Sequence, residues 1–238
     1  MTPNTEFPKI KPVKEKMDIH IPDIIDGVPN RNGFIWVLSG SGGSGKSSLL
    51  LNFFREPKLF RGKFHNIFYI CPMASFLSVR EHPFSEHSPE RVFHELNEDV
   101  LETIYTELKT IKEESEDEPQ YSVCIIDDMA DALKEASIVK QLNKMLIKAR
   151  HLSCAFVFTL QSYYYFPKIL RKQITNTTIF KPKNLEEWDS IAKELLHLNK
   201  DDGLKLYDFV FNEPYAHLDL DTVNNKVYKN FNELHIQG

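Results

Sequence analysis

One glycine-rich segment constrains this chain more than any other feature. Residues 40–47 read Gly-Ser-Gly-Gly-Ser-Gly-Lys-Ser, which satisfies the pattern G-x-x-x-x-G-K-S. An apolar run (34–39, FIWVLS) precedes the segment, and a stretch of helical character (SSLLLNFF) follows it. A backbone that curls around a phosphate with its N–H groups pointing inward needs glycine, because a Cβ opposes those conformations. The segment therefore predicts a strand, a phosphate-binding loop and a helix whose N-terminus faces the phosphates.

The residue types in this loop predict how a nucleotide is held. We expect Lys46 to reach the β- and γ-phosphates as a point charge and the Ser47 hydroxyl to bind Mg²⁺. The other predicted phosphate contacts are Gly40, Gly42, Gly43, Ser44, Gly45 and Ser48. A flexible glycine-serine turn is the alternative, but the apolar strand before the loop and the apolar helix after it favour nucleotide binding. ATP with Mg²⁺ is the predicted ligand.

The second element of the candidate site is a pair of acidic residues at the end of another apolar run, in residues 121–128 (YSVCIIDD). An acid at the end of a buried strand is the usual second side of a magnesium–nucleotide site, so Asp127 is expected to hold Mg²⁺ opposite Ser47. Asp128 is then placed to orient or deprotonate a water that attacks the γ-phosphate. The alternative for Asp128 is a structural cap on the following helix.

Two further polar residues extend the candidate site. The run 154–160 (CAFVFTL) ends in Gln161, and ligands of open α/β sheets bind at the carboxyl ends of the strands, so this amide is expected to sense the γ-phosphate or the water. Arg150 precedes the same strand and is a candidate arginine finger that reaches a neighbouring subunit's γ-phosphate. Arg171 competes for that role, and a surface cation is the alternative for either.

From Gly33 onward, apolar runs alternate with helical segments, which is typical of a parallel α/β sheet. Strands are expected at 34–39, 66–71, 123–126, 154–160 and 177–181, helices at 88–112, 130–149 and 184–198, and a hairpin at the C-terminus. A complete strand lies between the glycine-rich loop and the acidic strand. The predicted fold is an additional-strand P-loop NTPase with a central, mostly parallel sheet flanked by helices. We expect a proline-rich arm at 1–30 and one ATPase domain at 31–238.

The composition argues against several other classes of protein. The chain has 238 residues, a net charge of −5 and three cysteines, and no apolar run approaches the 18 residues of a membrane span. A disulfide framework, a membrane span and wholesale coating of nucleic acid are therefore not expected.

The charge is unevenly distributed. Residues 129–183 carry ten basic side chains against two acidic ones. Lys140, Lys144 and Lys148 recur at four-residue spacing and so share one helix face. Such a row can follow a phosphate backbone without reading bases, although a solvated helix face is the equally open alternative.

Three segments together resemble a known family: GSGGSGKSS, CIIDDM and KARHLSCAFVFTLQSYYYFPKILRKQ. They are similar to the genome-packaging ATPases of poxvirus-type large DNA viruses, within the FtsK/HerA superfamily of P-loop DNA translocases. The resemblance covers roughly residues 33–182. It implies Lys46 and Ser47 as Walker A, Asp127 and Asp128 as Walker B, Gln161 as sensor and Arg150 as the trans-acting finger.

The resemblance also implies a function and partners. It implies an ATPase that assembles as a homo-oligomeric ring and pumps double-stranded DNA, without sequence specificity, into a capsid. A capsid or portal-vertex protein is then a partner, and the host cytoplasm (the viral factory) or the virion is the expected location. Two alternatives remain open from the residues: a P-loop phosphotransferase, whose lid the segment 73–120 could hold, and a binding module switched by ATP without hydrolysis.

Overall fold

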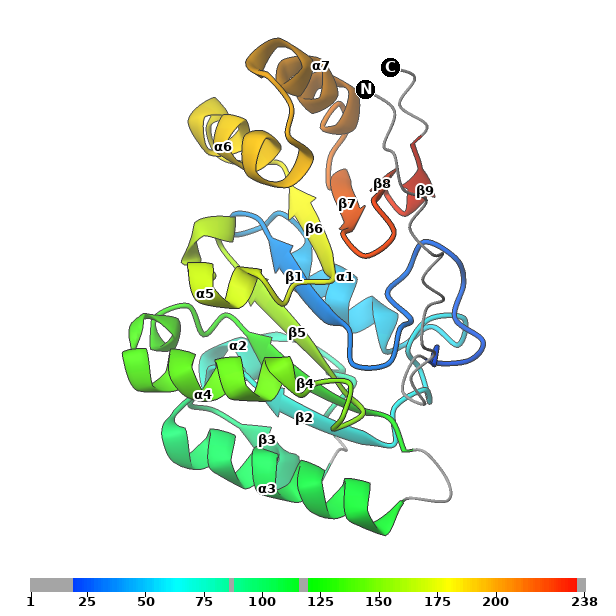
Figure 1. Ribbon diagram of the computed structural model, residues 1–238, viewed down its shortest axis with the longest axis vertical. Coiled ribbons are helices and arrows are strands. Elements are labelled where there is room, and N and C mark those ends of the chain that lie inside the picture. The colour runs from blue at the N-terminus through cyan, green and yellow to red at the C-terminus, as the bar shows by residue number, and fades with distance from the viewer. Residues whose placement is uncertain (1–18, 86–87, 116–119, 235–238) are drawn as a thin grey trace, which may run out of the picture.

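The computed structural model describes residues 19–85, 88–115 and 120–234, and the strands within these ranges form one nine-stranded sheet in the order β3-β2-β4-β5-β1-β6-β7-β8-β9 (Figure 1). The strands are β1 (Ile35–Ser39), β2 (Asn66–Ile70), β3 (Val92–Phe93), β4 (Ser122–Asp127), β5 (Cys154–Leu160), β6 (Asn176–Phe180), β7 (His217–Asp221), β8 (Lys226–Lys229) and β9 (Asn232–Glu233). Those from β3 to β6 in this order run parallel, and β7 to β9 add antiparallel pairs.

The strand order confirms the predicted fold class. β5 lies between β1, which leads into the glycine-rich loop, and β4, which ends in Asp127. A strand inserted at this place defines the additional-strand layout. Every side chain of β1, β4 and β5 is buried, because helices cover both faces of a parallel sheet. The predicted C-terminal hairpin is confirmed as β7 and β8.

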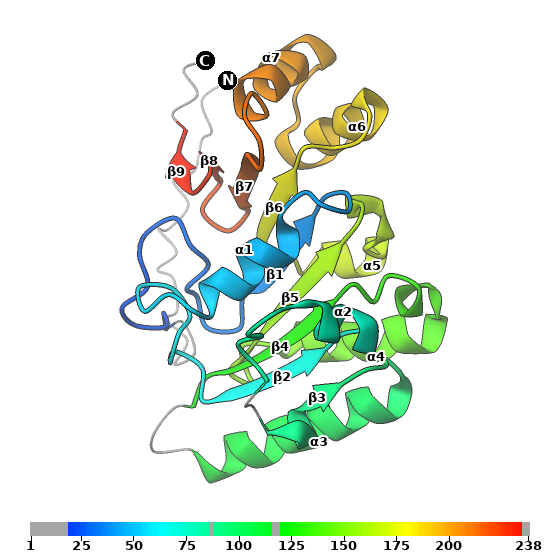
Figure 2. The same ribbon diagram turned by 180° about the vertical axis from the view of Figure 1, so that it is seen from behind.

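Helices cover the two faces unequally. α3 (Glu98–Glu114), α4 (Ala136–Ile147) and α5 (Lys168–Arg171) lie on the face toward the viewer in Figure 1, and α1 (Lys46–Phe53) and α2 (Met73–Ser78) lie on the opposite face (Figure 2). α6 (Leu185–Leu196) and α7 (Lys200–Val210) pack against each other beside β6. Alternate strand residues feed two separate apolar cores, so Ile35 and Val37 join the α3–α5 side whereas Trp36 and Leu38 join the α1 side.

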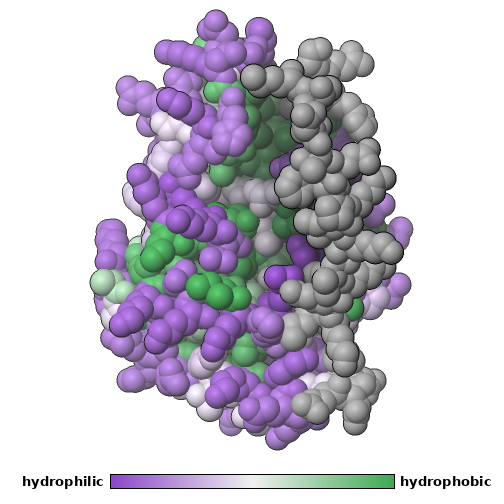
Figure 3. Space-filling view, viewed as in Figure 1, coloured by the Kyte–Doolittle hydropathy of each residue, from purple (hydrophilic) through white to green (hydrophobic). Residues whose placement is uncertain are grey.

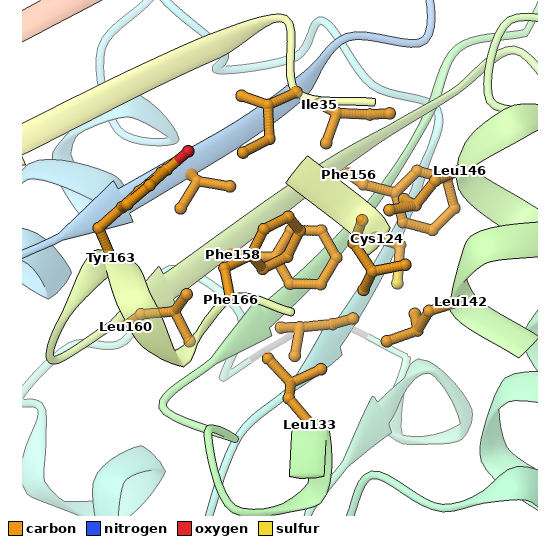
Figure 4. Close-up of a cluster of buried hydrophobic side chains, with 14 of the residues drawn as sticks. Ile35, Cys124, Leu133, Leu142, Leu146, Phe156, Phe158, Leu160, Tyr163 and Phe166 are labelled. Atoms are coloured by element: carbon orange, nitrogen blue, oxygen red, sulfur yellow. The ribbon is translucent and has the colours of Figure 1, made fainter. Parts of the chain in front are cut away.

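The core beneath α4 and α5 fixes the carboxyl end of β5, where Gln161 leaves the sheet. Phe156, Phe158 and Leu160 point toward this core, which also contains Leu142 of α4 and Phe166 (Figure 4). The rings of Phe158 and Phe166 meet edge to face with their centroids 4.8 Å apart. The aromatic run after Gln161 thus anchors a short 3₁₀ turn, η3 (Tyr163–Tyr165), to the sheet.

Two predicted helices begin later than expected. The prediction of one helix over 88–112 was wrong at its start, because Val92 and Phe93 pair with β2 and the Asn97 side chain accepts the N–H of Val100 as the cap of α3. The prediction over 130–149 was wrong in the same way, since a 3₁₀ turn, η2 (Ala132–Lys134), precedes α4. α2, α5, α7 and the short strands β3 and β9 were not predicted.

The predicted arm at 1–30 lies partly outside the described residues, so the boundary between arm and domain stays a prediction. Within the described part, Ile21 and Val28 are buried in the α1-side core. The backbone N–H of Ile21 donates to the carbonyl of Asn30 at 2.7 Å, which closes this segment on itself. Residues 19–30 therefore pack on the body of the molecule.

Candidate nucleotide-binding site

The glycine-rich loop leaves the carboxyl end of β1 and leads into α1, as predicted. Gly45, the N-cap of α1, has φ +103°, a conformation that side chains with a Cβ rarely adopt. A Cβ on Gly40 would lie 2.6 Å from Cβ of Phe180, so this position has no room for a side chain. The Ser44 hydroxyl oxygen is buried and has no hydrogen-bond partner among the described residues. Backbone curvature and an unpartnered hydroxyl together suit the binding of an anion.

Lys46 is folded back into this loop. Its ammonium donates to the carbonyl oxygens of Gly40 at 2.6 Å and Ser41 at 3.1 Å. Burial lowers the pKa of Lys46, while the carboxylates of Asp128 and Asp127 act in the opposite direction. The two predicted acidic residues therefore lie close enough to act electrostatically on the loop lysine.

Asp127 ends β4 in a buried position, with 4% of its surface exposed. One carboxylate oxygen accepts the hydroxyl of Tyr69 at 2.8 Å, and the other accepts the hydroxyl of Thr159. Burial and then the charge of Asp127 raise the pKa of Tyr69, which keeps the phenol protonated as a donor. Each carboxylate oxygen can accept a second bond. The carboxylate is thus held in one orientation with capacity left for water or a cation.

Asp128 lies one residue beyond the strand, with a left-handed backbone (φ 56°). Its N–H donates to the Thr159 hydroxyl at 3.1 Å, and its carboxylate accepts the Gln161 amide at 3.3 Å. The alternative reading as a helix cap fails, because Asp131 and Glu135 occupy the N-cap positions of η2 and α4. The structure therefore brings Asp128 and Gln161 together at the carboxyl edge of the sheet.

Sequence reasoning missed two residues of this site, Tyr69 and Thr159. Each lies inside a buried strand, where its type reads as ordinary strand composition. The register that pairs Asp127 with Thr159 places the threonine hydroxyl between the two aspartates. One signal was available: Thr159 is the single hydroxyl-bearing residue in an otherwise apolar strand, next to its carboxyl end.

The two candidate arginines differ in their surroundings. Arg171 donates to both carboxylate oxygens of Glu194, at 3.0 and 2.9 Å, and its guanidinium lies 4.7 Å from the ring centre of Tyr163. Arg150 is exposed and lies beside Gly33, which precedes β1. The glycine-rich loop follows β1, so Arg150 is at the opposite edge of the sheet, about 20 Å from its own loop at some 3.3 Å per strand residue.

The predicted lysine row lies on α4. Lys140 and Lys144 are exposed, and the ammonium of Lys148, just after the helix, donates to the Tyr105 hydroxyl of α3 at 2.9 Å. Ile147 of α4 and Ile169 of α5 are 58% and 55% exposed on the same side of the sheet, where apolar side chains gather between polar ones (Figure 3). We refer to Lys140, Lys144, Ile147 and Ile169 as the α4–α5 face.

Two cavities lie at the carboxyl edge of the sheet. On the side of β4 and β5, a cavity of about 400 Å³ is lined by Asp128, Gln161 and Tyr165 among others. On the side of β6 and β7, a cavity of about 660 Å³ is lined by loop residues 41–44 together with the segments 180–183 and 211–216. Asp128 and Gln161 thus line one cavity, and the glycine-rich loop lines the other.

Fold and site together define a P-loop NTPase of the additional-strand class. The sequence matches the family described as poxvirus A32 protein over residues 29–232, and the chain belongs to that family of genome-packaging ATPases. This match confirms the predicted ATPase activity and the resemblance to the genome-packaging ATPases of poxvirus-type viruses. No curated protein matches the chain significantly.

Solved structures of other proteins share this fold. The genome-packaging NTPase B204 of Sulfolobus turreted icosahedral virus 2, in complex with ATP-gammaS, is 20% identical with a TM-score of 0.59, over 87% of this chain and 99% of that one. The coupling protein TcpA of pCW3 conjugation, in its monomer form with ATPgS, is 12% identical with a TM-score of 0.59, over 98% of this chain and 71% of that one. At these identities the likeness shows the fold. Among the described residues, no helix has the length and apolar character to cross a membrane.

Proposed function

We propose that this chain hydrolyses ATP at the interfaces of a homo-oligomeric ring and thereby drives double-stranded DNA into a viral capsid. The observation that carries the proposal is the meeting of three elements at one sheet edge, in a member of the poxvirus A32 family: the glycine-rich loop with Lys46, the β4 aspartates, and Gln161. B204, which shares the fold, is a packaging NTPase with bound ATP-gammaS. A capsid or portal-vertex protein would be the partner, in the host cytoplasm or the virion.

The residues present fit a magnesium–ATP complex. Ser47 and Asp127 offer hydroxyl and carboxylate oxygens, which are the donors that Mg²⁺ takes in proteins, and both of Asp127's oxygens keep capacity for a bound water. When bound, Mg²⁺ supplies charge neutralisation of the β- and γ-phosphates. Lys46 and the loop N–H groups bind the phosphates, and Asp128 accepts a proton from the attacking water, which Gln161 helps to orient.

Arg150 is the proposed arginine finger, acting in trans. Its distance from its own glycine-rich loop, about 20 Å from the rise of a strand, is longer than one arginine side chain. Arg171 is the other candidate, and its guanidinium is held by Glu194 and by the carbonyl of Phe166. A neighbouring subunit supplying Arg150 would couple hydrolysis to ring assembly.

The α4–α5 face is the proposed contact with DNA. Lys140 and Lys144 present positive charge without a base-reading arrangement, which suits a motor that moves along any sequence. Binding of this kind releases counterions, so it weakens steeply as salt rises.

A mixing experiment tests the trans arrangement. Lys46→Ala and Arg150→Ala are each expected to be inactive, and an equal mixture should recover about a quarter of the wild-type rate, because random assembly pairs an intact loop with an intact finger at that frequency. Lys46→Ala mixed with the Lys46→Ala/Arg150→Ala double variant is the control and should stay inactive. An Arg150→Ala protein with wild-type turnover, or a mixture without recovery, contradicts the proposal.

Ring formation and DNA stimulation are tested separately. The ATPase rate is measured with and without double-stranded DNA, alongside the mass in solution with nucleotide bound. We expect an oligomer and a higher rate with DNA. A monomer whose ATPase rate is the same with and without DNA would refute the translocase function.

A further inference from the structure

The turn that carries Gln161 is attached to α6, a helix outside the nucleotide-binding motifs. Gln161 follows β5, and η3 completes a turn that we call the sensor turn (residues 161–165). The Ser162 hydroxyl donates to Oε1 of Glu187 on α6 at 2.6 Å and accepts the N–H of Tyr164 at 3.3 Å. A hydrogen bond to a carboxylate is charge-assisted and therefore stronger than one between neutral groups. The residue next to Gln161 is thus fixed by two contacts.

A second carboxylate of α6 holds the rest of the same turn. Glu194 accepts the Tyr163 hydroxyl at 3.3 Å and the Arg171 guanidinium at 2.9 and 3.0 Å. The same guanidinium donates to the carbonyl of Phe166, just after the sensor turn, at 2.9 Å. Glu187 and Glu194 are seven residues apart, so they lie on one face of the helix. This face of α6 therefore supports the sensor turn at two points.

Glu187 also lies close to the glycine-rich loop. It lines a small cavity together with Gly40, Gln161 and other residues. The N–H of Gly40 donates to the carbonyl of Leu160 at 3.0 Å, which joins the loop directly to the end of β5. Gln161 follows Leu160, so it leaves the sheet between a contact with the loop and a contact with α6.

The place of Glu187 in its own helix offers a simpler role, which an experiment has to separate. Glu187 is the third residue of α6, and its N–H donates to the side chain of Asn184, the N-cap, at 2.8 Å. A carboxylate in the first turn stabilises a helix through the helix dipole. Glu186 is in the same turn and is exposed. It supplies the same kind of dipole stabilisation without the contact to Ser162.

We propose that Glu187 is a positioning residue for Gln161: through Ser162 it holds the amide in place beside Asp128 while ATP is hydrolysed. The amide of Gln161 donates to the Asp128 carboxylate at 3.3 Å, so a displaced sensor turn would disturb this contact. The inference rests on the proposed function, because it assumes that Gln161 acts during hydrolysis. It makes α6 a determinant of turnover.

Steady-state ATPase kinetics in two backgrounds test the inference. In the otherwise wild-type protein, Glu187→Ala should lower kcat about tenfold and leave KM within about twofold, because a misplaced group loses transition-state stabilisation. In the Gln161→Ala protein, measured at enzyme concentrations where its slower turnover is still detectable, the same substitution should lower kcat no further, since the amide that it positions is absent. Glu187→Gln keeps an oxygen that accepts the Ser162 hydroxyl and should turn over close to wild type.

Glu186→Ala is the matched control, because it also removes a carboxylate from the first turn of α6, and it should leave kcat unchanged. Glu187→Ala should lower the melting temperature by about 2–4 °C in both backgrounds, as expected for one lost hydrogen bond. A loss of kcat that is equally large in the Gln161→Ala background, or a Glu187→Ala protein with wild-type kcat, would overturn the inference. A Gln161→Ala protein with wild-type kcat would refute the proposed role of Gln161 itself, and the inference with it.

Discussion

Thr159 offers the sharpest test of how the acidic site is held together. Its hydroxyl donates to Asp127 and accepts the N–H of Asp128, and its side chain is buried in β5. Thr159→Val keeps the shape and removes both bonds. A hydrogen bond to a charged group contributes about 1.5–3 kcal/mol and a neutral one about 1 kcal/mol, so unfolding should cost about 3 kcal/mol less in the variant.

The expected loss is measurable in two assays. For a chain of this length, 1 kcal/mol lowers the melting temperature by about 2–4 °C, so calorimetry should show a decrease of about 6–12 °C. The turnover number should also fall at least tenfold, because the left-handed backbone at Asp128 loses a partner and its carboxylate shifts. The affinity for ATP should change little, since Lys46 of the glycine-rich loop is held by the carbonyls of Gly40 and Ser41, which the substitution leaves in place.

Thr159→Ser distinguishes the hydroxyl from the packing. It keeps both hydrogen bonds and removes one buried methyl, which should lower the unfolding free energy by only about 1 kcal/mol, with turnover near wild type. If Thr159→Val melted and turned over like wild type, or if Thr159→Ser were as damaged as Thr159→Val, the hydroxyl would not be what positions the aspartates.

Three further predictions concern other residues. Tyr69→Phe deletes the other donor to Asp127 and should lower the unfolding free energy by about 2 kcal/mol, measured by urea denaturation; Tyr163→Phe, whose acceptor is partly exposed, should lose less. Lys140→Glu combined with Lys144→Glu should abolish stimulation by DNA and spare the basal ATPase rate, and persistent stimulation would remove the α4–α5 face from the mechanism. Burial raises the pKa of the Cys124 thiol to about 12, so this thiol stays protonated below that pH and should resist iodoacetamide at pH 8, as followed by mass spectrometry; rapid labelling of the folded protein would contradict its burial.

The sequence predicted the parts of the fold that depend on local pattern. Four of the five predicted strands are short, mostly apolar runs, and the structure forms each of them as a strand of the sheet. Runs of this kind are typical of parallel strands that helices cover on both faces. The helix that begins at Glu98 was predicted to begin at Ser88, because Ser88 and Pro89 also satisfy the rules for a helix N-terminus. Val92 and Phe93 instead form a strand that pairs with β2. Local sequence patterns do not encode this contact between distant segments.

The residues of the site also divide into those that local patterns reveal and those that depend on contacts between strands. Lys46, Asp127, Asp128 and Gln161 were found from motifs at strand ends, and the structure places all four at one edge of the sheet, while their individual roles stay predictions. Thr159 was missed because its importance comes from strand register, which is set by the whole sheet. Residues that position others within a sheet leave weak signals in a single sequence.

Thr159→Val should also separate the two kinetic constants. The acidic groups come from the carboxyl ends of β4 and β5, on one side of β1 and its glycine-rich loop. They act on charge that develops in the transition state, so their displacement should lower kcat and leave KM nearly unchanged. A rise in KM with unchanged kcat would mean that Thr159 acts on nucleotide binding and not through the aspartates.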